Sequence, residues 1–238
     1  MDAFLQGIVQ GLTEFLPVSS SGHLVLMSLF GFRGDLPFVA FLHLGTFFAV
    51  LAFTFKELLK VLRNLRLIVA LIVSTAPAAL VWILFKDAVE RSFNPRVLPL
   101  TFSVTALFLL LASVKSGNKR MEDITFLDAL IIGVFQAFAL LPGISRSGMT
   151  ISAALLLGYS PESAVYYSFL MSLPATLAGG ILNVEGAGTQ AMLGLVSSLL
   201  FGLLALFLVR KAVFSGKFHL FSYYLVAVSI FAYFGVIA

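Results

Sequence analysis

Side chains that suit phosphate chemistry stand in two short polar clusters of an otherwise apolar sequence. The first cluster contains Glu14, Ser20 and His23, and the second contains Arg146. A carboxylate, a hydroxyl and an imidazole commonly serve as metal ligand or base, nucleophile and proton carrier. The planar guanidinium of an arginine pairs with two phosphate oxygens at once. An arginine between apolar stretches needs an anionic partner, and we expect Glu14 as the partner of Arg146 in the protein and phosphate as its ligand. These four residues are therefore the expected catalytic groups of a phosphoryl-transfer site.

Serines and glycines surround the four residues in both clusters. Serine is a favourable helix N-cap, and the free N–H groups at a helix N-terminus, with the positive end of the dipole, attract phosphate. Glycine lets the backbone approach a ligand closely. The residues expected to bind the substrate in this way are Ser19, Ser21, Gly22, Gly143, Ser145, Ser147, Gly148 and Thr150.

The two clusters belong to a segment that occurs twice. With an offset of 126 residues, the pattern Asp-Ala-x-x-x-Gly-x-x-Gln of residues 2–10 recurs at residues 128–136, and the serine-glycine run of residues 19–22 recurs at 145–148. Polar groups are costly inside apolar sequence, so a matched pair of them predicts one site built by pseudo-symmetry. We expect Gln10 and Gln136 to satisfy backbone groups at a helix break. For His43, inside an apolar run, we expect a structural role.

The composition predicts an integral membrane protein. The chain is 60% hydrophobic and 11% charged, whereas soluble domains are about half apolar and about a quarter charged. Its apolar runs are long and charge-poor, which is typical of helices and not of barrel strands. The absence of cysteine excludes disulfides and thiolate metal sites. The basic residues lie in short loops between apolar runs, so the net charge of +4 does not indicate a nucleic-acid partner. Six segments are long enough to span a bilayer, namely residues 36–55, 66–85, 97–114, 162–182, 190–209 and 218–237.

The apolar pieces of the repeat are too short to span. Residues 3–16 and 20–32 flank Pro17, and residues 128–141 and 147–158 flank Pro142. Each pair is expected to form a re-entrant helical hairpin whose broken backbone is buried or lines a cavity. The expected fold is a single all-α membrane domain over residues 1–238, with six transmembrane helices and two re-entrant hairpins. Its halves, about 1–114 and 126–238, would form an inverted repeat with the site near the midplane.

The loop charges predict the orientation. If both hairpins return to their own side, one side of the membrane is richer in cations and is cytoplasmic by the positive-inside rule. Both termini would then face outside. The richer side receives Lys56, Lys60, Arg63, Arg66, Lys115, Lys119, Arg120, Arg210, Lys211 and Lys217, and the other receives Arg33, Lys86, Arg91 and Arg96.

Two stretches resemble the signatures of one family. Residues 10–24, QGLTEFLPVSSSGHL, look like the first signature of the undecaprenyl-diphosphate phosphatase (bacitracin-resistance) family. Residues 142–150, PGISRSGMT, look like its second, the PGxSRSxxT motif, and the rest of the chain has the family's layout. By motif position, Gln10 and Glu14 match the family's (E/Q)xxxE pair, which implies that they hold a metal ion. Ser20 and His23 match its proposed nucleophile and partner, and Arg146 its essential arginine.

The resemblance also implies an activity and a location. Members of the family are enzymes of the bacterial plasma membrane that remove the terminal phosphate of the C55 polyprenyl diphosphate carrier. The resemblance implies an outward-facing site and a divalent cation, Mg²⁺ or Ca²⁺. Recycling of the carrier would serve peptidoglycan synthesis and cell shape and would confer bacitracin resistance.

Three alternatives stay open at this point. Either Ser20 or His23 could be the nucleophile. A transporter or flippase of a phosphorylated polyprenyl lipid would use the same anion site and inverted repeat without a nucleophile. Small residues on the helix faces would allow a homodimer without requiring one.

Overall fold

The computed structural model describes residues 3–28, 36–114, 117–181 and 189–237. In the first half, the helices are α1 (Ala3–Phe15), α2 (Ser20–Ser28), α3 (Leu36–Leu62), α4 (Leu65–Arg91), the 3₁₀ turn η1 (Pro95–Val97) and α5 (Leu98–Ser113). In the second half they are η2 (Met121–Asp123), α6 (Phe126–Phe138), α7 (Arg146–Leu156), α8 (Pro161–Ile181), α9 (Thr189–Phe214) and α10 (Leu220–Ile237). The predicted all-α class is confirmed for these residues. The end of the predicted piece 20–32, together with Arg33 and Lys115, lies outside them.

Long apolar helices make this a multi-pass membrane protein. Five helices among the described residues are long and apolar enough to cross a membrane, and they correspond to the first five predicted segments. The sixth predicted segment, residues 218–237, forms α10, which is apolar but shorter. Large apolar side chains are exposed along these helices, as for Ile83, Leu84 and Phe85 of α4. Such exposure suits contact with lipid, because lipid tails are as apolar as the side chains.

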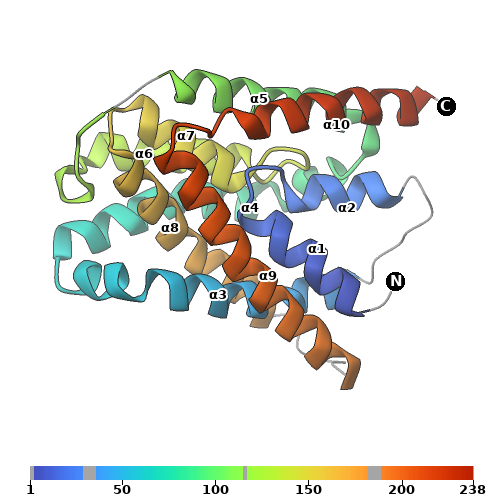
Figure 1. The fold of residues 1–238 in the computed structure, drawn as a ribbon, viewed down its shortest axis with the longest axis horizontal. Coiled ribbons are helices and arrows are strands. Elements are labelled where there is room, and N and C mark those ends of the chain that lie inside the picture. Colours follow the sequence, from blue (N-terminus) through green and yellow to red (C-terminus); the bar gives the residue numbers. More distant parts are fainter. Residues whose placement is uncertain (1–2, 29–35, 115–116, 182–188, 238) are drawn as a thin grey trace.

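Prolines and serine N-caps determine where the four short helices α1, α2, α6 and α7 end and begin. The helix α1 ends just before Pro17, and α2 begins after the N-cap Ser19, whose side chain accepts a hydrogen bond from the backbone of Gly22. In the second copy, α6 ends before Pro142, and Ser145 caps α7. In Figure 1, α1 and α2 lie toward one end of the molecule, and α6 and α7 lie toward the opposite end.

The two halves pack on each other in matched pairs. The helix α1 packs against α9, and its counterpart α6 packs against α4; α3 pairs with α8, and α5 with α10. The helices α5 and α10 lie side by side along one edge of the molecule in Figure 1. Glycines that recur in the repeat, Gly7 and Gly133, permit the contacts of α1 with α9 and of α6 with α4. A methyl group at Gly7 would overlap Gly194 and Ser197 of α9, and one at Gly133 would overlap Ser74 of α4.

Candidate active site

The tips of the two short helix pairs meet inside the protein. The side-chain oxygen of Ser19 accepts hydrogen bonds from the backbone N–H groups of Gly22 at 3.2 Å and of Gly143 at 3.1 Å. A methyl group added at Gly22 would lie 2.7 Å from the Cα atom of Gly143, so only glycine permits this approach. The predicted juxtaposition of the two serine-glycine clusters is therefore present.

A threonine of α5 holds the second tip in place. The Oγ1 atom of Thr105 accepts from the backbone N–H of Ser145 at 3.2 Å and donates to the carbonyl of Gly143 at 3.1 Å. The turn needs the left-handed backbone of Gly143, with φ 88°. These contacts satisfy the polar backbone of a turn that has left the helical pattern and is buried in the protein.

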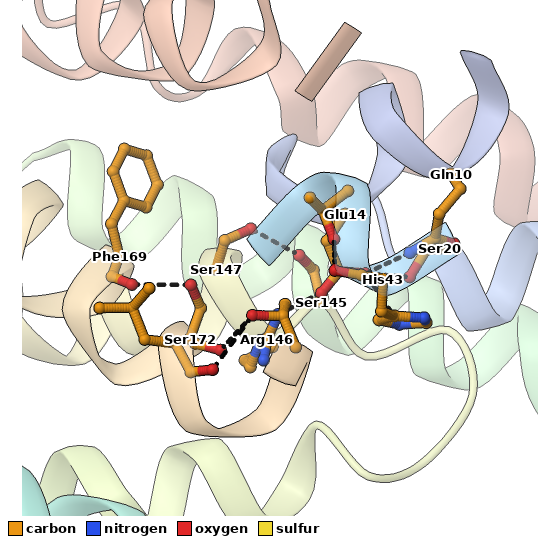
Figure 2. Close-up of polar contacts among 12 residues, drawn as sticks. Gln10, Glu14, Ser20, His43, Ser145, Arg146, Ser147, Phe169 and Ser172 are labelled. Atoms are coloured by element: carbon orange, nitrogen blue, oxygen red, sulfur yellow. Dashed lines mark hydrogen bonds and ion pairs between the residues drawn. The ribbon is translucent and has the colours of Figure 1, made fainter. Parts of the chain in front are cut away.

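The buried carboxylate of Glu14 lies at the centre of the polar contacts. It pairs with the guanidinium of Arg146 and accepts hydrogen bonds from Gln10 Nε2 at 3.0 Å and Ser20 Oγ at 3.2 Å. The Nε2 atom of His43 lies 3.5 Å from the same carboxylate. Figure 2 shows Glu14 among these side chains, which come from α1, α2, α3 and α7. A buried charge needs such a set of partners, so the expected Glu14–Arg146 pair is confirmed.

A cavity of about 210 Å³ opens beside this cluster. Its walls come from both short helix pairs and from α3, α4 and α8. The polar residues that line it are Thr13, Glu14, Ser19, Ser20, Ser21, His43, Gln136, Ser145 and Arg146. With N-termini of two helices and one guanidinium at its wall, the cavity is suited to an anion. It is too small for a long polyprenyl chain but fits a polar headgroup.

In the structure, the side chain of His23 bonds groups other than Ser20. The ring nitrogens of His23 lie 2.7 Å from the carbonyl of Ser19 and 2.7 Å from the hydroxyl of Tyr224 on α10. Its ring stacks on that of Tyr224 with a centroid distance of 5.8 Å. Among the described contacts, Ser20 bonds Glu14 and not His23. The sequence placed both residues on one helical face but could not show which neighbour each would meet.

The remaining predicted binding residues lie behind the cavity wall. The hydroxyl of Thr150 bonds the carbonyl of Arg146 at 2.8 Å and lies 2.6 Å from the hydroxyl of Ser168 on α8. The hydroxyl of Ser147 donates weakly to the carbonyl of Leu16 at 3.4 Å. At Gly148, an added methyl group would lie 3.1 to 3.3 Å from Ser145 and Pro17, so this glycine allows close packing of the two tips. In this arrangement these residues support the site from behind.

The donor set around Glu14 is compatible with a cation that is shared with the substrate. Within the described residues, no group of three or more His, Cys, Asp or Glu side chains could hold a metal ion by itself. Magnesium is commonly held by one or two carboxylates together with substrate phosphates, and it keeps several waters. Glu14 supplies one carboxylate at the cavity, and the side-chain amide of Gln10 adjoins it. The residues present thus fit a cation that arrives with phosphate groups.

Four residues of the site escaped the sequence-based prediction. His43 reaches the carboxylate of Glu14, although we expected only a structural role for it. Gln136 lines the cavity, and its Oε1 atom has no hydrogen-bond partner among the described residues, so this oxygen does not satisfy a backbone group there as we expected. Thr105 bonds the second tip, and Tyr224 bonds His23. The repeat could have drawn attention to Gln136, but nothing in the spacing of the other three indicates the site.

The fold and the site define a class of protein: a multi-pass helical membrane protein with a polar cavity and a buried glutamate–arginine pair between two broken-helix tips. A family model described as bacitracin resistance protein BacA matches residues 3–231. The chain belongs to this family.

Relatives match over nearly the whole length. A protein of Thermotoga sp. (strain RQ2) named undecaprenyl-diphosphatase is 50% identical over 237 residues, which cover 98% of this chain and 99% of the relative. A protein of the same name from Thermotoga maritima is 49% identical with the same coverage. A third, from Methanococcus maripaludis (strain C6), is 45% identical over 244 residues, covering 97% of this chain and 98% of the relative.

Proposed function

We propose that the protein is an integral membrane phosphatase. It hydrolyses undecaprenyl diphosphate to undecaprenyl phosphate and inorganic phosphate, recycles the lipid carrier of cell-wall synthesis and confers bacitracin resistance. The observation that carries this proposal is the guanidinium of Arg146 beside Glu14 and Ser20, in a cavity that receives the N-termini of α2 and α7. The family and the names of the relatives support the same activity.

The proposal includes an inverted repeat of about residues 1–114 and 126–238, with six spans and two re-entrant hairpins. The matched packing of α1 on α9 and of α6 on α4 supports it. Two further features support it. The short helix pairs lie at opposite ends of the molecule, and α1 begins at the end at which α10 ends. With the cation-rich loops cytoplasmic, both termini and the mouth of the site face the outside of the bacterial plasma membrane.

The diphosphate occupies the cavity, and the polyprenyl chain lies outside it in the lipid. Arg146 is held by Glu14 in the structure. Both groups can accept two hydrogen bonds from a guanidinium, but the diphosphate carries more negative charge than one carboxylate, so the substrate draws Arg146 away from Glu14. The N–H groups at the starts of α2 and α7 bind the remaining oxygens. Glu14 is thereby released for its second partner, Ser20.

Ser20 attacks the terminal phosphorus, and the bond from that phosphorus to the bridging oxygen breaks. Glu14 is the base within hydrogen-bond reach of the Ser20 hydroxyl, at 3.2 Å, so it takes the proton in this proposal. Undecaprenyl phosphate leaves, and water then hydrolyses the phosphoserine to release phosphate. His23, the base expected from the motif, bonds the carbonyl of Ser19 and thereby positions the first tip. The rival assignment of His23 as nucleophile requires its ring to leave Tyr224.

Glu14 and Gln10 are the proposed holders of a divalent cation, Mg²⁺ or Ca²⁺, together with the substrate phosphates. When bound, the cation neutralises negative charge on the phosphate oxygens. The protein's own part is to keep the carboxylate of Glu14 oriented. The hydrogen bond from Gln10 does this, and the Nε2 atom of His43 lies 3.5 Å from the same carboxylate.

Translocation of the same lipid is a second candidate function. Short helix pairs that enter from opposite ends and meet at a polar cavity are the architecture of many transporters. A flippase would need the anion site but no nucleophile, so substitution of Ser20 separates the two functions.

The direct test is phosphate release from undecaprenyl diphosphate by the purified protein in detergent, with magnesium and with a chelator. We expect metal-dependent release by the wild type and its loss in Arg146→Ala. Absence of release by a well-folded wild type in both conditions would refute the phosphatase and leave the flippase.

A further inference from the structure

The two repeated glutamines are in unequal surroundings. Gln10 donates a hydrogen bond from Nε2 to Glu14, four residues further along α1. Gln136 stands at the equivalent position of α6, but Leu140 occupies the place that corresponds to Glu14. The side chain of Gln136 has thus lost the intrahelical partner that its counterpart retains.

The Oε1 atom of the Gln136 amide is buried without a hydrogen-bond partner in the part of the protein that the structure describes. The residue is 4% exposed, and its Oε1 atom has no hydrogen-bond partner within residues 3–28, 36–114, 117–181 and 189–237. A buried polar atom without a partner lowers stability, and native structures contain few of them. The turn after α6 does not explain the residue, because its backbone carbonyl, and not its side chain, accepts the hydrogen bond from Ala139 at 3.0 Å.

The same residue belongs to the wall of the anion cavity. Gln136 lines it together with Arg146, Ser145 and Ser20. A glutamine amide offers two N–H donors and one acceptor, and turning it by 180° exchanges these groups with little change of shape. It can therefore meet both an anionic oxygen and a hydroxyl or water beside it.

We propose that Gln136 is a substrate-binding residue whose amide hydrogen-bonds the diphosphate headgroup beside Arg146. The N–H group donates to a phosphate oxygen, and the carbonyl accepts from a protonated phosphate oxygen or from water bound to it. This inference rests on the proposed phosphatase function and adds a contact from the second copy of the repeat that the motifs do not contain. The Oε1 atom has no partner among the described residues because its partner belongs to the ligand or to water bound to it.

The test compares Gln136→Leu with the matched variant Gln10→Leu. In the ligand-free protein, Gln136→Leu should unfold at the wild-type temperature or above, since an unpartnered amide is replaced by an apolar chain. Gln10→Leu should unfold at a lower temperature, because Glu14 loses a donor. Inorganic pyrophosphate, used as the headgroup probe, should raise the unfolding temperature of the wild type and do so markedly less in Gln136→Leu.

Kinetics provide the second measurement. Gln136→Leu should raise the KM for undecaprenyl diphosphate by about tenfold or more, which is the loss expected for one hydrogen bond to a charged group, with a smaller change in kcat. Gln136→Glu keeps the shape but adds negative charge, so it should weaken pyrophosphate protection further.

Three results separate the inference from the function on which it rests. A destabilised Gln136→Leu with wild-type KM and pyrophosphate protection would make the residue structural and overturn the inference alone. A wild type that releases no phosphate, yet is protected by pyrophosphate in a Gln136-dependent way, would refute the phosphatase and retain the contact. If Gln136→Leu does not fold, equal pyrophosphate protection of Gln136→Glu and wild type would still overturn the inference.

Discussion

The side-chain oxygen of Ser19 accepts a hydrogen bond from the backbone N–H of Gly143 at 3.1 Å, and this bond joins the tips of the two broken helix pairs. The same oxygen caps α2 through Gly22. Ser19 adopts a left-handed backbone with φ 69°, which is unusual for a residue that has a side chain. One residue therefore combines backbone strain, a helix cap and the contact between the halves, next to the nucleophile proposed for the reaction.

Ser19→Ala and Ser19→Gly are expected to differ in stability. Both remove the acceptor and leave two buried N–H groups without it, at about 1–3 kcal/mol for each group. Only glycine relieves the left-handed strain, so Ser19→Gly should be more stable than Ser19→Ala by about 1 kcal/mol. Thermal unfolding in detergent measures this order. A Ser19→Ala variant as stable as the wild type would show that the bond to Gly143 contributes nothing.

Gly22→Ala should disrupt the junction of the tips. Its methyl group would lie 2.7 Å from the backbone of Gly143 and 2.8 Å from the ring of Phe102. Forced overpacking of this kind costs about 1–3 kcal/mol. The matched control is Gly179→Ala in α8, where the added methyl group meets His43 at an ordinary 3.6 Å. We expect lower unfolding temperature and lost phosphate release for Gly22→Ala, and near wild-type values for the control; equal behaviour of the two would contradict the close approach.

Arg146→Lys should be folded but inactive. Lysine retains a positive charge for the buried carboxylate of Glu14, so stability should fall less than in Arg146→Ala. A point charge does not replace the bidentate fork that binds phosphate. We expect kcat/KM to fall a hundredfold or more, since transition-state donors are worth about that much. A lysine variant with more than a tenth of the wild-type kcat/KM would refute the role of the fork.

Ser20→Ala should abolish turnover and spare the binding of lipid. The proposed nucleophile bonds Glu14, whereas its neighbour Ser21 contacts Ser19 at 3.4 Å. Phosphate release should therefore fall at least about a hundredfold in Ser20→Ala and less than about tenfold in Ser21→Ala. A translocation assay on the same proteins decides the alternative, because a flippase would retain transport in Ser20→Ala. Phosphate release by Ser20→Ala at the wild-type rate would exclude the hydroxyl as nucleophile.

Local sequence determined the class of fold, the helix breaks and the chemical character of the site. Apolar runs without charges become membrane helices because lipid offers no partner to a free backbone group. Pro17 and Pro142 end helices, and Ser19 and Ser145 cap the next ones, through bonds within a few residues. The repeat and the scarcity of buried charges also sufficed to pair Glu14 with a distant arginine.

Only the tertiary structure decided which side chains reach the cavity. His23 shares a helix with Ser20 but bonds Tyr224, which is 201 residues away. His43 comes from α3 to the carboxylate, and Gln136 comes from α6 to the cavity with an Oε1 atom that no described residue bonds. Spacing along a helix fixes the face of a residue, whereas the neighbour that meets this face depends on how the two halves pack. The sequence therefore specified the chemistry, and the packing of the halves selected the residues that carry it.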